Sequence, residues 1–279
     1  MNFGPFNLGL VQRALREILG ITLVFAGVLA TISGLLAYAL PRIQARFMQR
    51  QFIPPGVKQF RDAILGLDST GAGVSEVAFA IAWSHPIVLA LLSAHAIMVC
   101  TRVLAGEVER GTVDVLLALP VSRLRLLASE TLAWLITAGV VLAAVYAGSY
   151  VGAQFIKPEF RPDWAKLFMV LCNLSLVYAV IGCAALLVAH YTDRRVRAVL
   201  AVIVITIFSL LINFLHTLDP ALEFTKQLAF LSFLDYYKPI GMLLSGEWPW
   251  KDMGILAGAC VVLWTGTAVI LSRRDITTT

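Results

Sequence analysis

The chain of 279 residues is strongly apolar, because 59% of its residues are hydrophobic and only 14% are charged. Ordinary soluble domains carry about 25% charged residues, so the composition excludes an ordinary soluble globular protein. The net charge of +5 is spread over the polar segments. It includes no basic patch with interleaved aromatic residues and gives no reason to expect a nucleic-acid partner.

Six long runs without Asp, Glu, Lys or Arg divide the chain. A bilayer core about 30 Å thick requires roughly 20 apolar helical residues, and the runs are too long for barrel strands. Helices also satisfy their own backbone hydrogen bonds within lipid. We therefore predict an all-α membrane protein, with residues 1–279 forming a single transmembrane domain. The predicted spans are residues 18–41, 77–101, 131–156, 167–192, 198–218 and 253–272.

The amino-terminal segment, residues 1–17, places apolar and charged side chains at helical spacing. This pattern predicts a short amphipathic helix in the membrane interface. The first span could be mistaken for a cleavable signal peptide, since Ala37-Tyr38-Ala39 imitates a cleavage site. The run of 24 residues is longer than the about 7–15 residues of a signal core, so we expect it to be retained as a membrane helix.

The distribution of positive charge indicates the orientation. If the amino terminus is cytoplasmic, the two sides of the membrane carry equal numbers of Lys and Arg, but the cytoplasmic segments are shorter and therefore denser in charge. The short turn at residues 193–197 also holds an arginine cluster of the kind that orients neighbouring spans. We predict that both termini and residues 102–130 are cytoplasmic, whereas residues 42–76 and 219–252 are external.

The second external segment, residues 219–252, is apolar but too interrupted to span the membrane. Short helices over Leu222–Leu234 and Pro239–Leu244 would form a re-entrant-like pair that dips into one leaflet. Trp248 and Trp250 would then mark the interface. A surface loop packed on the protein is the alternative.

A polar joint separates the second and third spans. We expect the second span to continue as a helix to about Arg110, where Gly111 breaks it. Thr112 then caps a short new helix, with Asp114 near its positive end. Pro120 ends this helix because its ring and its missing N–H prevent continuation.

The joint would thus hold a short transverse helix between two long ones, and Ser122 would cap the second of these. A simple polar loop is the alternative that the residues leave open. The spacing of Gly106 and Gly111 imitates a phosphate-binding loop. That segment lacks the lysine, carries two glutamates and follows no strand, so it predicts no nucleotide site.

Residues 107–123 read Glu-Val-Glu-Arg-Gly-Thr-Val-Asp-Val-Leu-Leu-Ala-Leu-Pro-Val-Ser-Arg. This segment resembles the cytoplasmic coupling signature of type-2 ABC transporter permeases, which is Glu-x-x-x-Gly-Thr-hydrophobic-acidic-x-Leu-Leu-x-x-Pro-hydrophobic-Ser-Arg. Residues 231–237, the last span and residues 272–276 are also similar to the end of such permeases. The resemblance is closest to short permeases with separate ATPase subunits, including those of gliding machinery and copper-enzyme maturation clusters.

The resemblance implies the membrane subunit of an ATP-driven exporter in the cell (inner or cytoplasmic) membrane. Two cytoplasmic ATPase subunits would bind ATP and Mg, while this chain would bind no cofactor and would not itself be an enzyme. A second permease copy would complete a homodimer or a related heterodimer in membrane lipid. ATP-driven closure of the ATPases would move the joint and tilt the adjoining spans, and residues 219–252 would form an external gate.

The resemblance also assigns site residues. Those implied for ATPase coupling are Glu107, Arg110, Gly111, Thr112, Asp114, Leu116, Leu117, Leu119, Pro120 and Arg123. The leucines would include the docking side chains, the glycine and proline would fix the shape, and the two arginines would pair with acidic groups of the partner. Those implied for the external gate are Leu231, Asp235, Tyr236 and Tyr237.

An ion-coupled secondary transporter or channel is the main alternative function, and a membrane enzyme is the second. Ionisable residues within the membrane are the usual mark of ion coupling, and the six runs offer only histidines. His85 and His95 lie too far from a common helix face to share a metal ion, and we expect capping or packing roles for them. The sequence also lacks the common hydrolase and metalloprotease motifs, so we predict no catalytic and no metal site.

Overall fold

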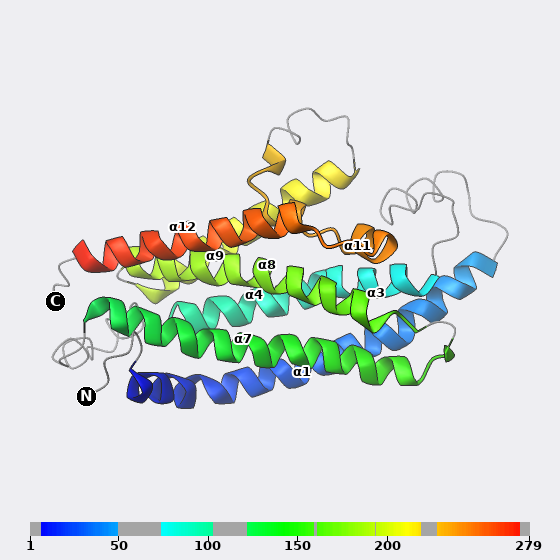
Figure 1. The fold of residues 1–279 in the computed structure, drawn as a ribbon, viewed down its shortest axis with the longest axis horizontal. Helices are drawn as coiled ribbons and strands as arrows, with labels where there is room; N and C mark the ends of the chain where they lie inside the picture. The colour runs from blue at the N-terminus through cyan, green and yellow to red at the C-terminus, as the bar shows by residue number, and fades with distance from the viewer. Residues whose placement is uncertain are drawn as a thin grey trace.

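The computed structural model describes residues 7–49, 74–102, 122–158, 161–192, 194–218 and 228–273. Every regular element in these ranges is a helix, and the long helices run side by side along the long axis of the molecule (Figure 1). Five of them are long and apolar enough to cross a membrane, and a bent pair provides a sixth candidate. The described part of the chain therefore has the predicted all-α architecture.

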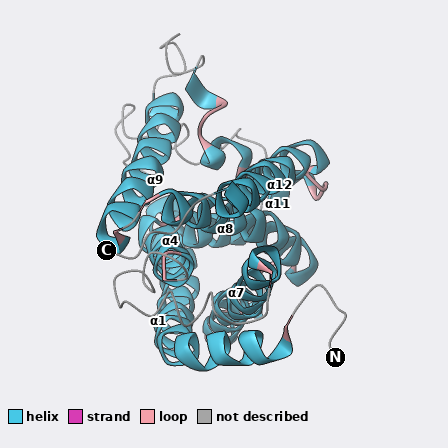
Figure 2. Ribbon diagram, turned by 90° about the vertical axis from the view of Figure 1, so that its left-hand side faces the viewer, coloured by secondary structure: helices cyan, strands magenta, loops and turns pink. Residues whose placement is uncertain are grey.

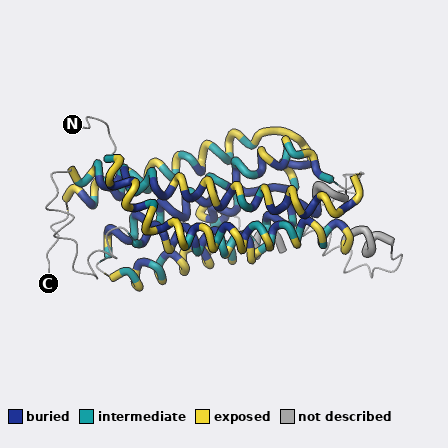
Figure 3. The backbone as a smooth tube through the Cα atoms, turned by 90° about the horizontal axis from the view of Figure 1, so that it is seen from below, coloured by how far each residue is buried: buried dark blue, intermediate teal, exposed yellow. Residues whose placement is uncertain are grey.

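The helices are named in chain order in Figure 1. They are α1 (Leu8–Gln49), α3 (Val74–Ser84), α4 (Pro86–Cys100), α7 (Arg123–Gln154), α8 (Trp164–Tyr191), α9 (Arg195–Leu218), α11 (Pro239–Ser245) and α12 (Trp250–Arg273), and a short 3₁₀ helix, η2 (Phe233–Tyr236), precedes α11. Buried positions face the interior of the bundle and exposed positions face outward along each long helix (Figure 3). Because most of the exposed side chains on the long helices are apolar, this outer surface suits a lipid environment.

The predicted amphipathic segment is the beginning of α1 rather than a separate helix. Its first turns run across the long axis of the bundle, and the helix then turns to follow that axis (Figure 2). The start is fixed by Asn7, whose backbone N–H donates to Ser129 Oγ of α7 at 2.9 Å. An amphipathic helical start that lies across the bundle is the geometry expected of an interfacial helix.

Helices α1 and α7 pack along most of their length, and glycines allow their backbones to meet. A Cβ atom added at Gly148 would overlap the Ala30 carbonyl, and one added at Gly152 would overlap the carbonyl of Gly34. Small residues spaced by four positions permit such close helix contacts in membranes. The carboxyl-terminal half of α7 is therefore placed against α1 by backbone shape rather than by large interlocking side chains.

The second predicted span is two helices, because α3 and α4 meet at a bend of 41°. Pro86 occupies the first turn of α4, where its missing N–H leaves no hydrogen bond unmade. His85 caps this turn, since its Nδ1 accepts a hydrogen bond from the backbone N–H of Ile87 at 3.3 Å. The predicted capping role of His85 is confirmed.

The carboxyl end of α4 differs from the sequence prediction. The helix ends at Cys100, and Thr101 follows as its capping residue. The Thr101 hydroxyl donates to the Ile97 carbonyl at 2.7 Å, which satisfies one of the last carbonyls of the helix. The expectation that this helix runs on to Arg110 is therefore wrong at residues 101–102, which form a turn.

A chain of buried polar side chains crosses the core between four helices. His95 of α4 contacts Thr22 Oγ1 of α1 through Nε2 at 3.2 Å and the Tyr178 hydroxyl of α8 through Nδ1 at 2.8 Å. Trp134 of α7 donates from Nε1 to the same hydroxyl at 2.9 Å and stacks on the tyrosine ring. His95 is thus a fully buried packing residue whose polar atoms are satisfied.

Candidate functional site

The two helices that flank the predicted coupling segment, α4 and α7, end and begin at one end of the bundle, where α1 also starts and α12 also ends (Figure 1). Arg123 lies in the described part of the chain, as the first residue of α7. The other predicted coupling residues lie outside the described residues; they are Glu107, Arg110, Gly111, Thr112, Asp114, Leu116, Leu117, Leu119 and Pro120. The structure therefore shows the two flanks of this segment, which are Arg102 after α4 and Ser122 before α7.

The first flank is held by a cluster of charges in which Arg102, just after α4, meets one glutamate of α1 and one of α7. The Arg102 guanidinium pairs with Glu130 Oε2 of α7 at 3.2 Å and also with the Glu17 carboxylate of α1. The side chains of Arg102 and Glu130 are only 11% and 14% exposed. Charge-assisted pairs of this kind are stronger than hydrogen bonds between neutral groups. The residue at which the chain leaves α4 is thus fixed to two other helices.

The second flank is held at the start of α7. The Ser122 hydroxyl accepts a hydrogen bond from the backbone N–H of Arg125 at 3.3 Å, which confirms its predicted capping role. The Arg123 guanidinium donates from Nη1 to the Leu271 carbonyl at 3.0 Å, in the last turn of α12. Carbonyls in the last turn of a helix carry partial negative charge. Arg123 therefore joins α7 to α12, and its pairing with a partner protein stays a prediction.

Helix α9 joins the same end of the bundle. Its first residue, Arg195, donates from Nη2 to the Met98 carbonyl of α4 at 3.1 Å. Together with the contacts of Arg102 and Arg123, this bond links α1, α4, α7, α9 and α12 around the two flanks. A displacement of either flank would therefore act on helices that are far apart in the sequence.

The predicted gate residues lie toward the other end of the bundle, and their environments differ. Tyr237 is buried and donates its hydroxyl to the Trp83 carbonyl of α3 at 3.5 Å; this burial raises the pKa of Tyr237 above its usual value. Asp235 and Tyr236 belong to η2, and the Tyr236 hydroxyl donates to the Phe230 carbonyl at 3.1 Å. Leu231, in contrast, is 55% exposed. The structure therefore anchors Tyr237 to α3 and leaves Leu231 outside the packing.

The secondary structure of this segment partly differs from the prediction. Helix α11 (Pro239–Ser245) matches the predicted second short helix and ends at Gly246, whose φ of +69° favours glycine. The predicted first helix, Leu222–Leu234, begins outside the described residues, and residues 230–231 form a turn rather than its continuation. The chain turns here because Ser232 is buried against α9, where its hydroxyl donates to the Ser209 carbonyl at 2.9 Å. The depth of this segment in lipid stays a prediction.

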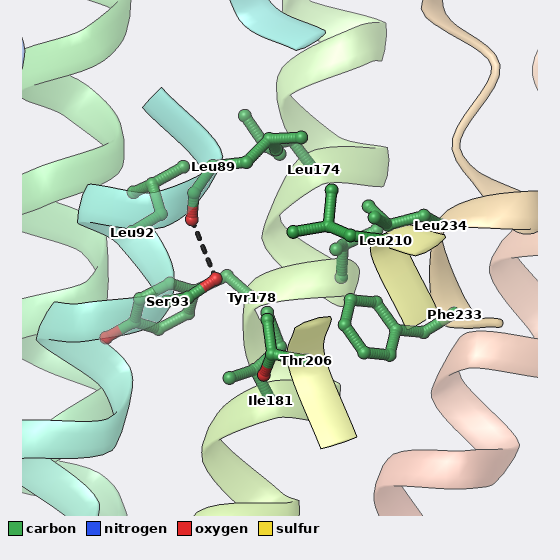
Figure 4. A pocket seen from close by; sticks show the side chains of 11 residues that line it. Leu89, Leu92, Ser93, Leu174, Tyr178, Ile181, Thr206, Leu210, Phe233 and Leu234 are labelled. Atoms are coloured by element: carbon green, nitrogen blue, oxygen red, sulfur yellow. Dashed lines mark hydrogen bonds between the residues drawn. The ribbon is translucent and has the colours of Figure 1, made fainter. Parts of the chain in front are cut away.

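A small apolar pocket lies where the described residues 228–246, called here the gate segment after their predicted role, meet the long helices (Figure 4). Phe233 and Leu234 approach it from the gate segment, and Leu89, Leu174 and Leu210 approach it from α4, α8 and α9. The free space is about 10 Å³, roughly the size of one water molecule. The gate segment thus seals the contact between these three helices.

Sequence reasoning did not identify Glu17, Arg102 and Glu130 as site residues. Each lies directly outside a predicted span, next to Ile18, Thr101 or Thr131. The signal that could have found them is the presence of opposite charges at three span ends predicted to share one membrane face. Among the described residues, no group of three or more His, Cys, Asp or Glu side chains is arranged to hold a metal ion.

Comparison with known proteins identifies the family of the chain. No curated protein and no solved structure matches the chain. A family model described as "ABC-2 family transporter protein" matches residues 16–276, which include all of the long helices from α3 to α12 and most of α1. The chain therefore belongs to the ABC-2 family of transporter proteins, as a multi-pass transmembrane permease that is not itself catalytic.

Proposed function

We propose that this permease is the membrane subunit of an ATP-driven exporter in the cytoplasmic (inner) membrane. A separate ATPase subunit would grip residues 107–123 on the cytoplasmic side and move them as it hydrolyses ATP. The observation that carries the proposal is the attachment of this segment, because both of its flanks are bonded to neighbouring helices. Membership of the ABC-2 family supports it, since such permeases normally work with an ABC ATPase partner.

The mechanism follows from how the flanks are held. Movement of Arg102 acts on α1 and α7 through the two carboxylates, and movement of Arg123 acts on α12 through the Leu271 carbonyl. The ATPase must contact the segment differently in its open and closed states, because tight binding alone shifts no equilibrium. Two ATPase copies would bind ATP and Mg²⁺, and a second permease copy would form a homodimer or a related heterodimer with this chain.

The gate segment would complete the cycle at the external side. The contact of Tyr237 with α3 and the contact of Ser232 with α9 close the described bundle over the small pocket. Tilting of α9 would separate Ser232 from Ser209 and open a path beside the gate. Export is the direction proposed, with the ATPase acting from the cytoplasm.

The experiment is reconstitution of the permease in liposomes together with its ABC ATPase partner. Arg110→Ala and Gly111→Val should lower nucleotide-dependent transport by about tenfold or more while leaving thermal stability unchanged, because both change the proposed coupling segment and not the helix bundle. Lys157→Ala is the control, since this exposed residue lies three positions beyond the far end of α7. Robust solute flux through the permease alone, without nucleotide, would instead identify an ion-coupled transporter or channel.

A further inference from the structure

A groove of about 500 Å³ runs along the outer face of α7, at the end of the bundle that holds both flanks of the coupling segment. Its walls are apolar and come from Leu124, Ala128, Leu132 and Leu135 of α7 and from Trp264 of α12. Arg125 lies at the terminal end of this wall. The groove is thus apolar along its length and cationic at one end.

Two hydrogen bonds hold α12 beside this face of α7. Trp264 Nε1 donates to Thr131 Oγ1 at 3.0 Å, and Arg123 Nη1 donates to the Leu271 carbonyl at 3.0 Å. The helices run in opposite directions (Figure 1), so these bonds fix them at two separate levels. The groove is therefore a feature with fixed walls rather than a gap between helices that are free to close.

The guanidinium of Arg125, at the end of the groove, forms no ion pair within the described part of the chain. The backbone N–H of Arg125 donates to Ser122, and its carbonyl accepts from Ser129, but no described group pairs with its guanidinium. A second apolar groove of about 610 Å³, between α1 and α7, provides a contrast. There the nearby Arg42 already stacks on the Tyr38 ring at 3.8 Å and donates to the Phe155 carbonyl at 2.8 Å.

The length of the groove also matches one leaflet of a membrane. Arg125 and Leu135 are ten residues apart on a continuous helix, which corresponds to about 15 Å along its axis. Half of a bilayer hydrocarbon core is also about 15 Å thick. A lipid whose phosphate lies at Arg125 would therefore place its acyl chain along Ala128, Leu132 and Leu135.

We propose that this groove binds one anionic phospholipid from the leaflet at the end of the bundle where α7 begins and α12 ends. The guanidinium of Arg125 would pair with the lipid phosphate, since its planar donors match phosphate oxygens. The Ser122 hydroxyl, which lines the same end, would donate a further hydrogen bond. Basic residues beside membrane helices are known to recognise anionic head groups. The proposal goes beyond transport and does not depend on its direction.

The test is native mass spectrometry of the detergent-purified full chain, titrated with phosphatidylglycerol and with phosphatidylcholine of identical acyl chains. The unsubstituted protein should retain one phosphatidylglycerol about fivefold more tightly than phosphatidylcholine. Arg125→Ala should abolish this preference, and Arg125→Lys should keep most of it. Arg197→Ala is the matched control, because Arg197 is an exposed arginine at the same end but on α9. An unchanged preference in Arg125→Ala, or an equal loss in Arg197→Ala, would overturn the proposal.

A second pair of variants tests the apolar part of the groove. Ala128→Leu should weaken retention of both lipids because it fills the groove, whereas Ala147→Leu fills the groove between α1 and α7 and should leave the phosphatidylglycerol preference unchanged. Inorganic phosphate should not displace the bound lipid, because it lacks the acyl chain. Displacement by phosphate would reduce the site to an anion site. A disulfide between two copies carrying Leu132→Cys would show that a second chain covers the groove. Displacement by phosphate and formation of this disulfide would each refute a lipid site.

Discussion

Arg102 joins the end of α4 to α1 and α7 through its pairs with Glu17 and Glu130. Its position matters because charges removed from water must keep their partners; a buried carboxylate without one is costly. The contact between Arg13 and Glu17 is a different case, since the Arg13 side chain is 47% exposed. Exposed pairs of this kind contribute little to stability.

We expect Arg102→Ala to lower the free energy of unfolding by about 2–3 kcal/mol, because it removes a largely buried guanidinium and its pairs with Glu130 and Glu17. Arg13→Ala should cost about 0.5 kcal/mol or less. Thermal and denaturant unfolding of both variants in the same detergent measures the difference. Equal effects would show that the Arg102 cluster is no more than a surface ion pair.

Local residue roles could be predicted from the sequence, and long-range ones could not. Ser122 and His85 cap helices through neighbours two or three residues away, so their roles follow from adjacent sequence. The hydrogen bonds between His95 and Tyr178 and between Trp134 and Tyr178 join residues 83 and 44 positions apart. Such pairs depend on how the helices are arranged, which the residue pattern alone does not specify.

At the scale of helices, the apolar runs locate the elements but not their ends. Helix α12 begins at Trp250, before the predicted start at residue 253, and α8 begins at Trp164, capped by Asp163, before residue 167. Helices extend past their apolar runs because the interface still supports backbone hydrogen bonds and offers caps. Proline often persists inside membrane helices, so the break at Pro86 did not follow from its presence. The coupling helix lies outside the described residues and stays a prediction.

The packing of α1 on α7 gives a prediction about helix contact. Gly148→Leu should destabilise the protein by about 2–3 kcal/mol, because the new side chain would meet the backbone of α1 at Ala30. Gly139→Leu is the matched control on the same helix, since nothing lies within 4 Å of a Cβ added there. It should change stability by about 0.5 kcal/mol or less.

Chemical denaturation in detergent micelles checks both glycine variants. If Gly139→Leu proved as harmful as Gly148→Leu, the cost would reflect a general intolerance of larger side chains on α7. The close approach of α1 and α7 would then not be the cause.

At the scale of the whole molecule, the structure places the start of α7 and the end of α12 together, with α11 toward the opposite end (Figure 1). The amino-acid sequence predicted this arrangement by counting spans, and the density of arginine suggested which side is cytoplasmic. The relative placement follows from the described helices. The assignment to a membrane side rests on charge and stays a prediction.

We expect Ser122→Cys and Ser272→Cys to react with a membrane-impermeant maleimide only in inverted vesicles. Glu247→Cys should react only in right-side-out vesicles, because it lies on the exposed turn after α11. The native cysteines are replaced by alanine as the background. Reaction of Ser122→Cys from the external side would end the proposal of a cytoplasmic coupling segment. Opposite sides for Ser122→Cys and Ser272→Cys would contradict the arrangement of the helices themselves.

The bend between α3 and α4 divides the second candidate span into two helices with different partners. Helix α3 is bonded to α7 through Trp83 Nε1, which donates to Ser149 Oγ at 2.9 Å. Helix α4 is bonded to α1 and α8 through His95. An unbroken helix resists bending because every turn is hydrogen-bonded to the next, but Pro86 provides no N–H at this joint. A tilt of α4 can therefore be taken up at this bend while α3 stays bonded to α7. Movement of Arg102 would then reach α4 before it reaches α3.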